Sequence, residues 1–274
     1  MKQNNLKDNS REEINLKKTI LSTIGKTLLI IWFACGFLFV TTAVLAPQII
    51  TPALTSLGCN SANYLLYKRM YVRDDSNQNL YNVIQLAIEN EYYEEQTQLI
   101  SEMINRDDFA EFAQKIDEKT KAMLGKRFSV YADSYESYLR RHLVSALYNT
   151  GKEIEAKMMA IDSVYGKADE LYVYVKLVVE DKNLEDSQKE SEMTTLYTRY
   201  DLMRSLDIKM LELDESLSLS ESDYDSVIVI EQKIKLAEVK LLIGKYTKDK
   251  DLENQAAQDI ELWNNQMKQL LENL

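Results

Sequence analysis

The sequence predicts an all-α protein, with one N-terminal transmembrane helix followed by an array of helical hairpins. Three observations predict this class. An apolar run near the N-terminus is long enough to cross a bilayer, proline is absent after Pro52, and apolar residues recur at three- and four-residue steps. Sheets and loop-rich enzymes need turn residues with unusual φ values, whereas helices joined by short loops do not.

The N-terminal apolar run predicts a membrane anchor. No charged side chain occurs between Lys26 and Lys68, and the core of this gap, residues 28–46, is predominantly apolar. A helix needs about 20 apolar residues to cross a hydrocarbon layer of about 30 Å. We therefore expect a tail over residues 1–26 and a transmembrane helix over residues 27–47.

The charges around this run predict its orientation. Residues 1–26 contain six basic and three acidic side chains, and basic residues do not return until Lys68 and Arg69. By the positive-inside rule, the tail is cytoplasmic and the C-terminal domain is extracytoplasmic, as in a single-pass protein of the cell membrane with an uncleaved signal-anchor. The alternative is a signal peptide that is cleaved after Ala46.

A juxtamembrane segment is expected over residues 48–75. Pro47 and Pro52 predict a break after Ala46. The segment either continues as a helix above the membrane or lies in the interface, with Tyr64 and Tyr67 at the level of the headgroups. Of the two cysteines, Cys35 falls in the span and Cys59 just after it, so we expect a free thiol or, at Cys59, a bond to a second copy of the chain.

The remaining residues, 76–274, are predicted to form an acidic α-helical domain. Apolar stripes at helical spacing begin at Leu80 and return up to Leu271. Helix starts are expected where a capping side chain is followed three residues later by a carboxylate, at Asp108, Asn183 and Ser220. Residues 171–179 and 227–230 are rich in strand-forming residues, but both run into charged helical stretches without a turn, so we interpret them as buried helix.

Helix breaks are expected at intervals of a helix–turn–helix repeat, near Asn90, Gly125, Asn149–Gly151, Asp181–Asn183, Asp214 and Thr247. The sequence ALYNTGKEIEA, at Ala146–Ala156, resembles the turn of a tetratricopeptide repeat, because Gly151 precedes the small residue Ala156 by five positions. Val144 replaces that family's glycine, and its leading aromatic residue and closing proline are not matched. The resemblance implies a tetratricopeptide-like solenoid; an irregular helical bundle is the alternative.

No motif for catalysis, a cofactor or a metal is found, so we predict that the protein is not an enzyme. His142 is the sole histidine, and a lone histidine on a helix is usually a packing or surface residue. We therefore assign no catalytic, cofactor-binding or metal-ligating residue. The net charge of −11 also argues against nucleic acid as a partner.

The hypothesis that remains is a membrane-anchored helical scaffold, on the outer side of the membrane, that binds a protein or peptide partner. The acidic charge favours a basic partner, and self-association is a further expectation. The seventeen tyrosines either fill the edge of the core or line a groove together with acidic residues. Two alternatives are an envelope enzyme with an unrecognised carboxylate site and an anchor whose cytoplasmic tail makes the functional contact. Abundant Lys, Asn, Ile and Tyr are typical of a bacterium with an AT-rich genome.

Overall fold

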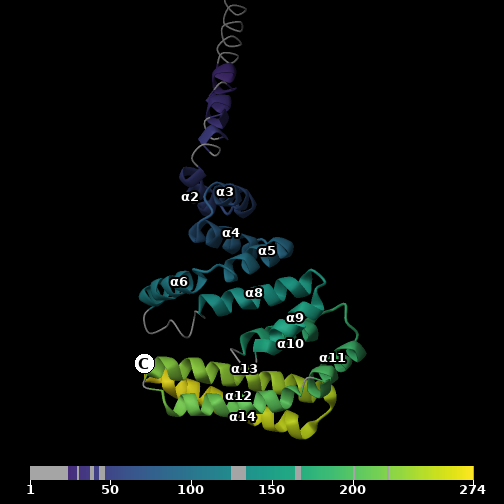
Figure 1. The fold of residues 1–274 in the computed structure, drawn as a ribbon. Coiled ribbons are helices and arrows are strands. Elements are labelled where there is room, and N and C mark those ends of the chain that lie inside the picture. Colours follow the sequence, from purple (N-terminus) through teal and green to yellow (C-terminus); the bar gives the residue numbers. More distant parts are fainter. Residues whose placement is uncertain are drawn as a thin grey trace, which may run out of the picture. The chain divides into compact units, whose positions relative to one another are not determined.

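The computed structural model describes residues 24–29, 31–37, 40–42, 47–124, 134–163, 168–199, 201–220 and 222–273. Every regular element among these residues is a helix and none is a strand, which confirms the predicted all-α class. The chain divides into two compact units, Met1–Asp75 and Ser76–Leu274, which are described separately (Figure 1).

The first unit contains the apolar helix Ile24–Thr42. Its mean hydropathy is 1.9 and none of it is buried by the rest of the protein. Its length and composition are those of a helix that is able to cross a membrane, either as a membrane anchor or as a signal sequence.

Two further helices, α2 (Pro47–Ser56) and α3 (Asn60–Arg73), complete the first unit. They contact each other, and the side-chain amide of Asn63 hydrogen-bonds the hydroxyl of Thr55 across 2.6 Å. Pro52 lies inside α2, and the break expected after Ala46 falls outside the described residues. Tyr64 is only 4% exposed, so protein and not a headgroup layer surrounds its ring.

The second unit begins with helices α4 (Asn77–Glu89), α5 (Tyr93–Ile104), α6 (Phe109–Leu124) and α8 (Tyr135–Asn149). α5 packs on α4 and on α8, and α6 packs on α8. Serine side chains start two of them, since Ser76 Oγ accepts from Asn79 N–H and Ser134 Oγ from Ser137 N–H. The break expected near Asn90 is present, and the one near Gly125 lies outside the described residues.

Helices α9 (Glu153–Asp162), α10 (Asp169–Glu180) and α11 (Asp186–Arg199) follow. The segment 171–179 forms most of α10, as predicted. Its buried side chains, Leu171, Tyr174, Val175 and Val178, are spaced three and four residues apart. Because this spacing gathers them on one helical face, burial outweighs the strand preference of the β-branched residues.

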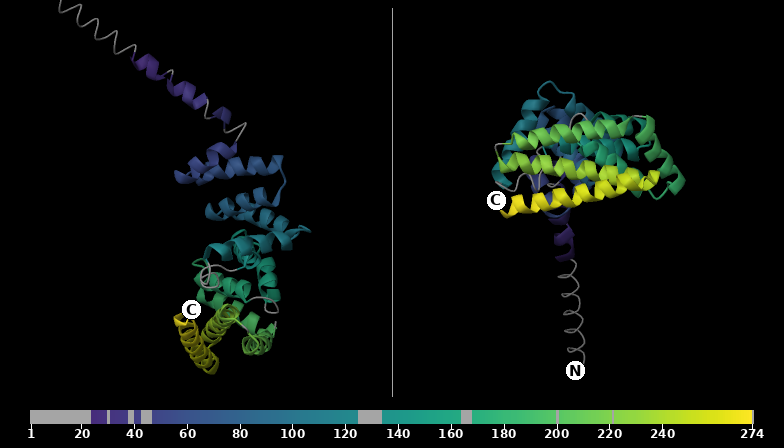
Figure 2. Two further views of the ribbon diagram at one scale, coloured as in Figure 1. Left: turned by 90° about the vertical axis from the view of Figure 1, so that its left-hand side faces the viewer. Right: turned by 90° about the horizontal axis from the view of Figure 1, so that it is seen from below.

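Three long helices close the unit and lie side by side, α12 (Leu202–Ser218), α13 (Asp223–Thr247) and α14 (Lys250–Glu272) (Figure 2). α13 is the central one, because it contacts α10, α11, α12 and α14. Residues 227–230 are part of α13, which confirms the interpretation as helix. Two sequence-based predictions are wrong here: α12 continues through Asp214, and the cap of α13 is Ser222, whose Oγ accepts from Asp225 N–H, and not Ser220.

Candidate functional site

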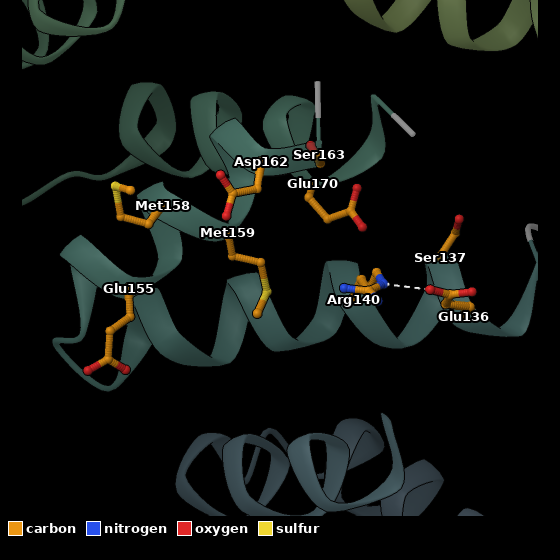
Figure 3. Close-up of a pocket in the computed structure, with 9 residues that line it drawn as sticks. All are labelled: Glu136, Ser137, Arg140, Glu155, Met158, Met159, Asp162, Ser163 and Glu170. Carbon is orange, nitrogen blue, oxygen red and sulfur yellow. Dashed lines mark hydrogen bonds and ion pairs between the residues drawn. The ribbon is translucent and has the colours of Figure 1, made fainter. Parts of the chain in front are cut away.

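A pocket of about 680 Å³ lies between α8, α9 and the start of α10 (Figure 3). Its lining combines carboxylates, one arginine, two methionines and two serines: Glu136, Ser137, Arg140, Glu155, Met158, Met159, Asp162, Ser163 and Glu170. This volume is within the range of pockets that hold a drug-sized ligand or a few side chains of a peptide. We take this pocket as the candidate functional site.

The turn between α8 and α9 sets the distance between the first two walls. Gly151 adopts a φ of +78°, a left-handed conformation that glycine enters without steric cost, and Lys152 N–H donates to Leu147 O across 2.8 Å. On α9, Ala156 and Ala160 are fully buried. Small side chains at these two positions allow the helices to approach closely.

The charge of the pocket is negative. Glu136, Glu155, Asp162 and Glu170 contribute four carboxylates, against the single guanidinium of Arg140. Arg140 Nε donates to Glu136 Oε1 across 2.8 Å, the dashed line in Figure 3. This pairing neutralises one carboxylate, so the pocket favours a cationic ligand.

Methionines supply the apolar part of the lining. Met158 is 44% exposed, and Ile154, one turn earlier on α9, is 76% exposed. At 3.6 residues per turn these two side chains share a face that is roughly opposite to Ala156 and Ala160. Flexible thioether side chains adapt to differently shaped partners, so exposed methionines are over-used at binding surfaces.

Buried polar groups also line the pocket. Ser137 is 2% exposed, and its Oγ has no hydrogen-bond partner within the described part of the chain. Glu170 is 3% exposed, whereas Glu136, Glu155 and Asp162 are exposed.

No tyrosine is among the described residues that line this pocket. Tyr135 is buried and packs against the rings of Tyr81, Phe112 and Tyr138. Burial raises the pKa of the Tyr135 hydroxyl above its usual value. These rings therefore belong to the packing between α4, α6 and α8.

His142 lies at the edge of this aromatic cluster, with its ring centroid 4.6 Å from that of Tyr138. Burial, together with the charge of Arg141, lowers the pKa of His142 to about 4. The imidazole is therefore neutral at pH 7.

A second group of tyrosines joins helices α8, α9, α10 and α11. Tyr148 donates to Asp181 Oδ2 across 2.8 Å, and Tyr174 donates to Glu192 Oε1 across 2.9 Å. Lys157 Nζ lies 2.6 Å from the same oxygen of Glu192. These contacts hold α9, α10 and α11 together and so support the walls of the pocket.

Within the described residues, no group of three or more histidine, cysteine, aspartate or glutamate side chains is arranged to hold a metal ion. Cys35 and Cys59 are both free thiols and exposed. Comparisons with protein-family models, curated proteins and solved structures found no match for this chain.

The residues that line the pocket were not predicted from the sequence. One feature of the sequence could have indicated them. Ile154 and Met158 form an apolar pair at i and i+4, on a different face of α9 from the buried Ala156 and Ala160. A helix with apolar residues on two faces has one face available for a partner. The carboxylates that line the pocket with Met158 come from three separate helices, and only the folded chain brings them together.

Proposed function

We propose that the protein is a membrane-anchored helical scaffold whose pocket between α8, α9 and α10 binds a basic segment of a protein or peptide. The observation that carries this proposal is the composition of the pocket, in which the exposed carboxylates of Glu155 and Asp162 form the lining together with exposed Met158. A lysine or arginine side chain matches this lining twice, because its charged end pairs with carboxylates and its aliphatic stem packs on thioethers.

The contacts between helices support an array over an irregular bundle. In the second unit most contacts join helices that are close in sequence, such as α4 with α5, α8 with α9 and α13 with α14. Nearest-neighbour stacking is typical of solenoids, which present extended surfaces to partners. We therefore favour a tetratricopeptide-like array, in which the turn at Gly151 and the buried Ala156 act as they do in that family.

The apolar helix Ile24–Thr42 supports a single-pass anchor, and the charges on either side support a cytoplasmic tail. Protease treatment of intact cells that express the chain with a C-terminal tag tests this orientation. We expect the tag to be lost from intact cells. A tag that survives until the cells are lysed would reverse the orientation and place the partner in the cytoplasm.

Selection of peptides tests the binding function directly. The full chain, held in lipid nanodiscs, is presented with a random peptide library, and the bound peptides are sequenced. We expect enrichment of peptides that carry lysine or arginine next to an apolar residue. Binding should weaken as salt is raised, because an exposed acidic rim is screened.

Two double variants separate the pocket from the overall acidity of the domain. Glu155→Gln with Asp162→Gln removes two exposed carboxylates of the rim, and Glu215→Gln with Glu261→Gln removes two exposed carboxylates on α12 and α14. The net charge changes equally in both. The first variant should lose the selected peptides and the control should keep them; equal retention by both would refute the pocket as the binding site.

A further inference from the structure

Helix α3 carries an exposed face that combines apolar and basic side chains. Leu65 is 66% exposed and Val72 is 80% exposed, although both are large and apolar. Lys68 and Arg69 are exposed as well. In a water-surrounded protein, apolar side chains that gather on one face of a helix indicate a surface that something else covers.

The arrangement around the helix axis is regular. At 3.6 residues per turn, Leu65 and Val72 are separated by about 20° around α3. Lys68 lies on one side of this pair, and Arg69 and Arg73 lie on the other. Buried Asn63 lies on the opposite side of the helix. Buried Tyr64 lies beyond Lys68, whose ammonium group is 5.4 Å from the centroid of the Tyr64 ring. One face therefore packs inside the protein, and the other presents two apolar side chains flanked by three cations.

We propose that this face of α3 lies on the surface of the membrane and binds the headgroups of anionic phospholipids. An apolar centre with flanking cations is the pattern of helices that lie in a bilayer interface, with apolar side chains inserted below the headgroups and cations among the phosphates. The carboxylates nearest to α3 in the sequence are Asp74 and Asp75, which follow its last residue, so the helix itself contains no acidic side chain.

The position of α3 in the sequence also supports the membrane surface as the partner of this face. Only residues 43–46 separate the apolar helix Ile24–Thr42 from α2, which contacts α3. Even a fully extended chain spans no more than about 3.5 Å per residue, so α2 begins within roughly 20 Å of the end of the span. Two more exposed apolar side chains lie in this part of the chain, Ile49 of α2 and Leu57 directly after α2, at 65% and 75% exposure.

Fluorescence in nanodiscs tests this proposal, which rests on the anchor but not on the pocket. The full chain is first freed of its own thiols by Cys35→Ser and Cys59→Ser. An environment-sensitive dye is then attached at Leu65→Cys or, as a control, at Leu219→Cys, which replaces a leucine of the second unit that is 78% exposed. Nitroxide-labelled lipid in the disc reports contact with the membrane.

In discs that contain phosphatidylglycerol we expect strong quenching at Leu65→Cys and little at Leu219→Cys. Each cation near an anionic surface favours binding about fivefold. The variant Lys68→Gln, Arg69→Gln and Arg73→Gln should therefore lower the ratio of bound to free helix about 100-fold at low salt. A variant with the same loss of charge on the second unit, Lys152→Gln, Lys182→Gln and Lys245→Gln, should leave the quenching unchanged.

Four outcomes would overturn the proposal. The dye at Leu65→Cys is as accessible to water as the dye at Leu219→Cys. Quenching at Leu65→Cys is as strong in phosphatidylcholine discs as in phosphatidylglycerol discs, and the triple variant of α3 does not lower it, so that the cations are not needed. The dye is shielded from water but unquenched by lipid nitroxide, so that protein covers the face. The chain fails to enter the discs, so that there is no anchor.

Discussion

Lys233 offers the sharpest test of how the second unit is stabilised. This side chain, on α13, is fully buried. Its ammonium group forms an ion pair with Asp214 of α12 and lies 3.7 Å from the centroid of the Trp263 ring of α14. One cation thus links the three long helices, and removal of its counter-ion should destabilise the protein.

The magnitude follows from the exposure of the two partners. Loss of one member of a fully buried ion pair costs about 3–5 kcal/mol, because the other charge is left without compensation. The side chain of Asp214 is 54% exposed, so solvent already screens the pair. We therefore expect Asp214→Asn to lower the free energy of unfolding by about 2 kcal/mol, while the contact with Trp263 still stabilises the ammonium group.

The opposite substitution should cost less. Lys233→Met removes the buried charge, keeps a side chain of similar length and leaves Asp214 where water can hydrate it. Replacement of a buried charged residue by an apolar one of similar volume is often close to neutral, so we expect a change within about 1 kcal/mol. The double variant Asp214→Asn with Lys233→Met should recover most of the stability lost in Asp214→Asn alone.

Urea unfolding of the full-length protein in detergent, followed by far-UV circular dichroism, measures these differences. With a urea dependence of about 2 kcal/mol per M, Asp214→Asn should lower the midpoint by about 1 M. Glu190→Gln is the matched control, since Glu190 pairs with Lys248 where both side chains are exposed, and should shift the midpoint far less. A Lys233→Met protein that is less stable than Asp214→Asn would refute the reasoning.

Three further predictions use the same unfolding assay. The pKa of His142 is about 4 in the folded chain and 6.5 when unfolded, so as the pH falls the unfolded state takes up a proton before the folded state does. The free energy of unfolding should therefore be full above pH 6.5 and decline by up to about 3 kcal/mol towards pH 4. His142→Gln should flatten this decline, and an unchanged pH profile would contradict the assignment. Ser222→Ala should lower the free energy of unfolding by about 1 kcal/mol through loss of the helix cap, and Ser220→Ala should lower it clearly less. If Ser220→Ala were the more destabilising of the two, Ser220 would be the cap, as expected from the sequence. Gly244→Ala should destabilise by about 1 kcal/mol, and not stabilise as in an open helix, because the added Cβ would lie 2.9 Å from Glu253 N; a rise in stability would show that α14 shifts freely.

The all-α class followed from the sequence because its causes are local. Proline and glycine restrict or free the backbone at their own positions, and the spacing of apolar residues fixes which helical face is buried. The strand-forming residues of 171–179 and 227–230 did not mislead for the same reason, since their neighbours continue the helical period.

Errors occurred where a long-range contact decides the outcome. Asp214 resembles a helix-breaking residue in sequence, but its carboxylate is paired with Lys233 of the next helix, and α12 continues through it. Ser220 and Ser222 are both residues that suit a helix start, because each is followed three residues later by an aspartate. In the structure Ser222 is the residue that caps α13. Nothing in the local sequence distinguishes a buried lysine from a solvated one.

The sequence by itself determined the helical class, the apolar N-terminal segment and the acidity of the domain, because each is a property of composition or of neighbouring residues. Only the tertiary structure decided which charges are buried on α13, which face of α3 is exposed, and that the carboxylates of α8, α9 and α10 line one pocket with Met158. Those outcomes depend on packing between helices that are far apart in the chain, and the period of one helix carries no information about its neighbours.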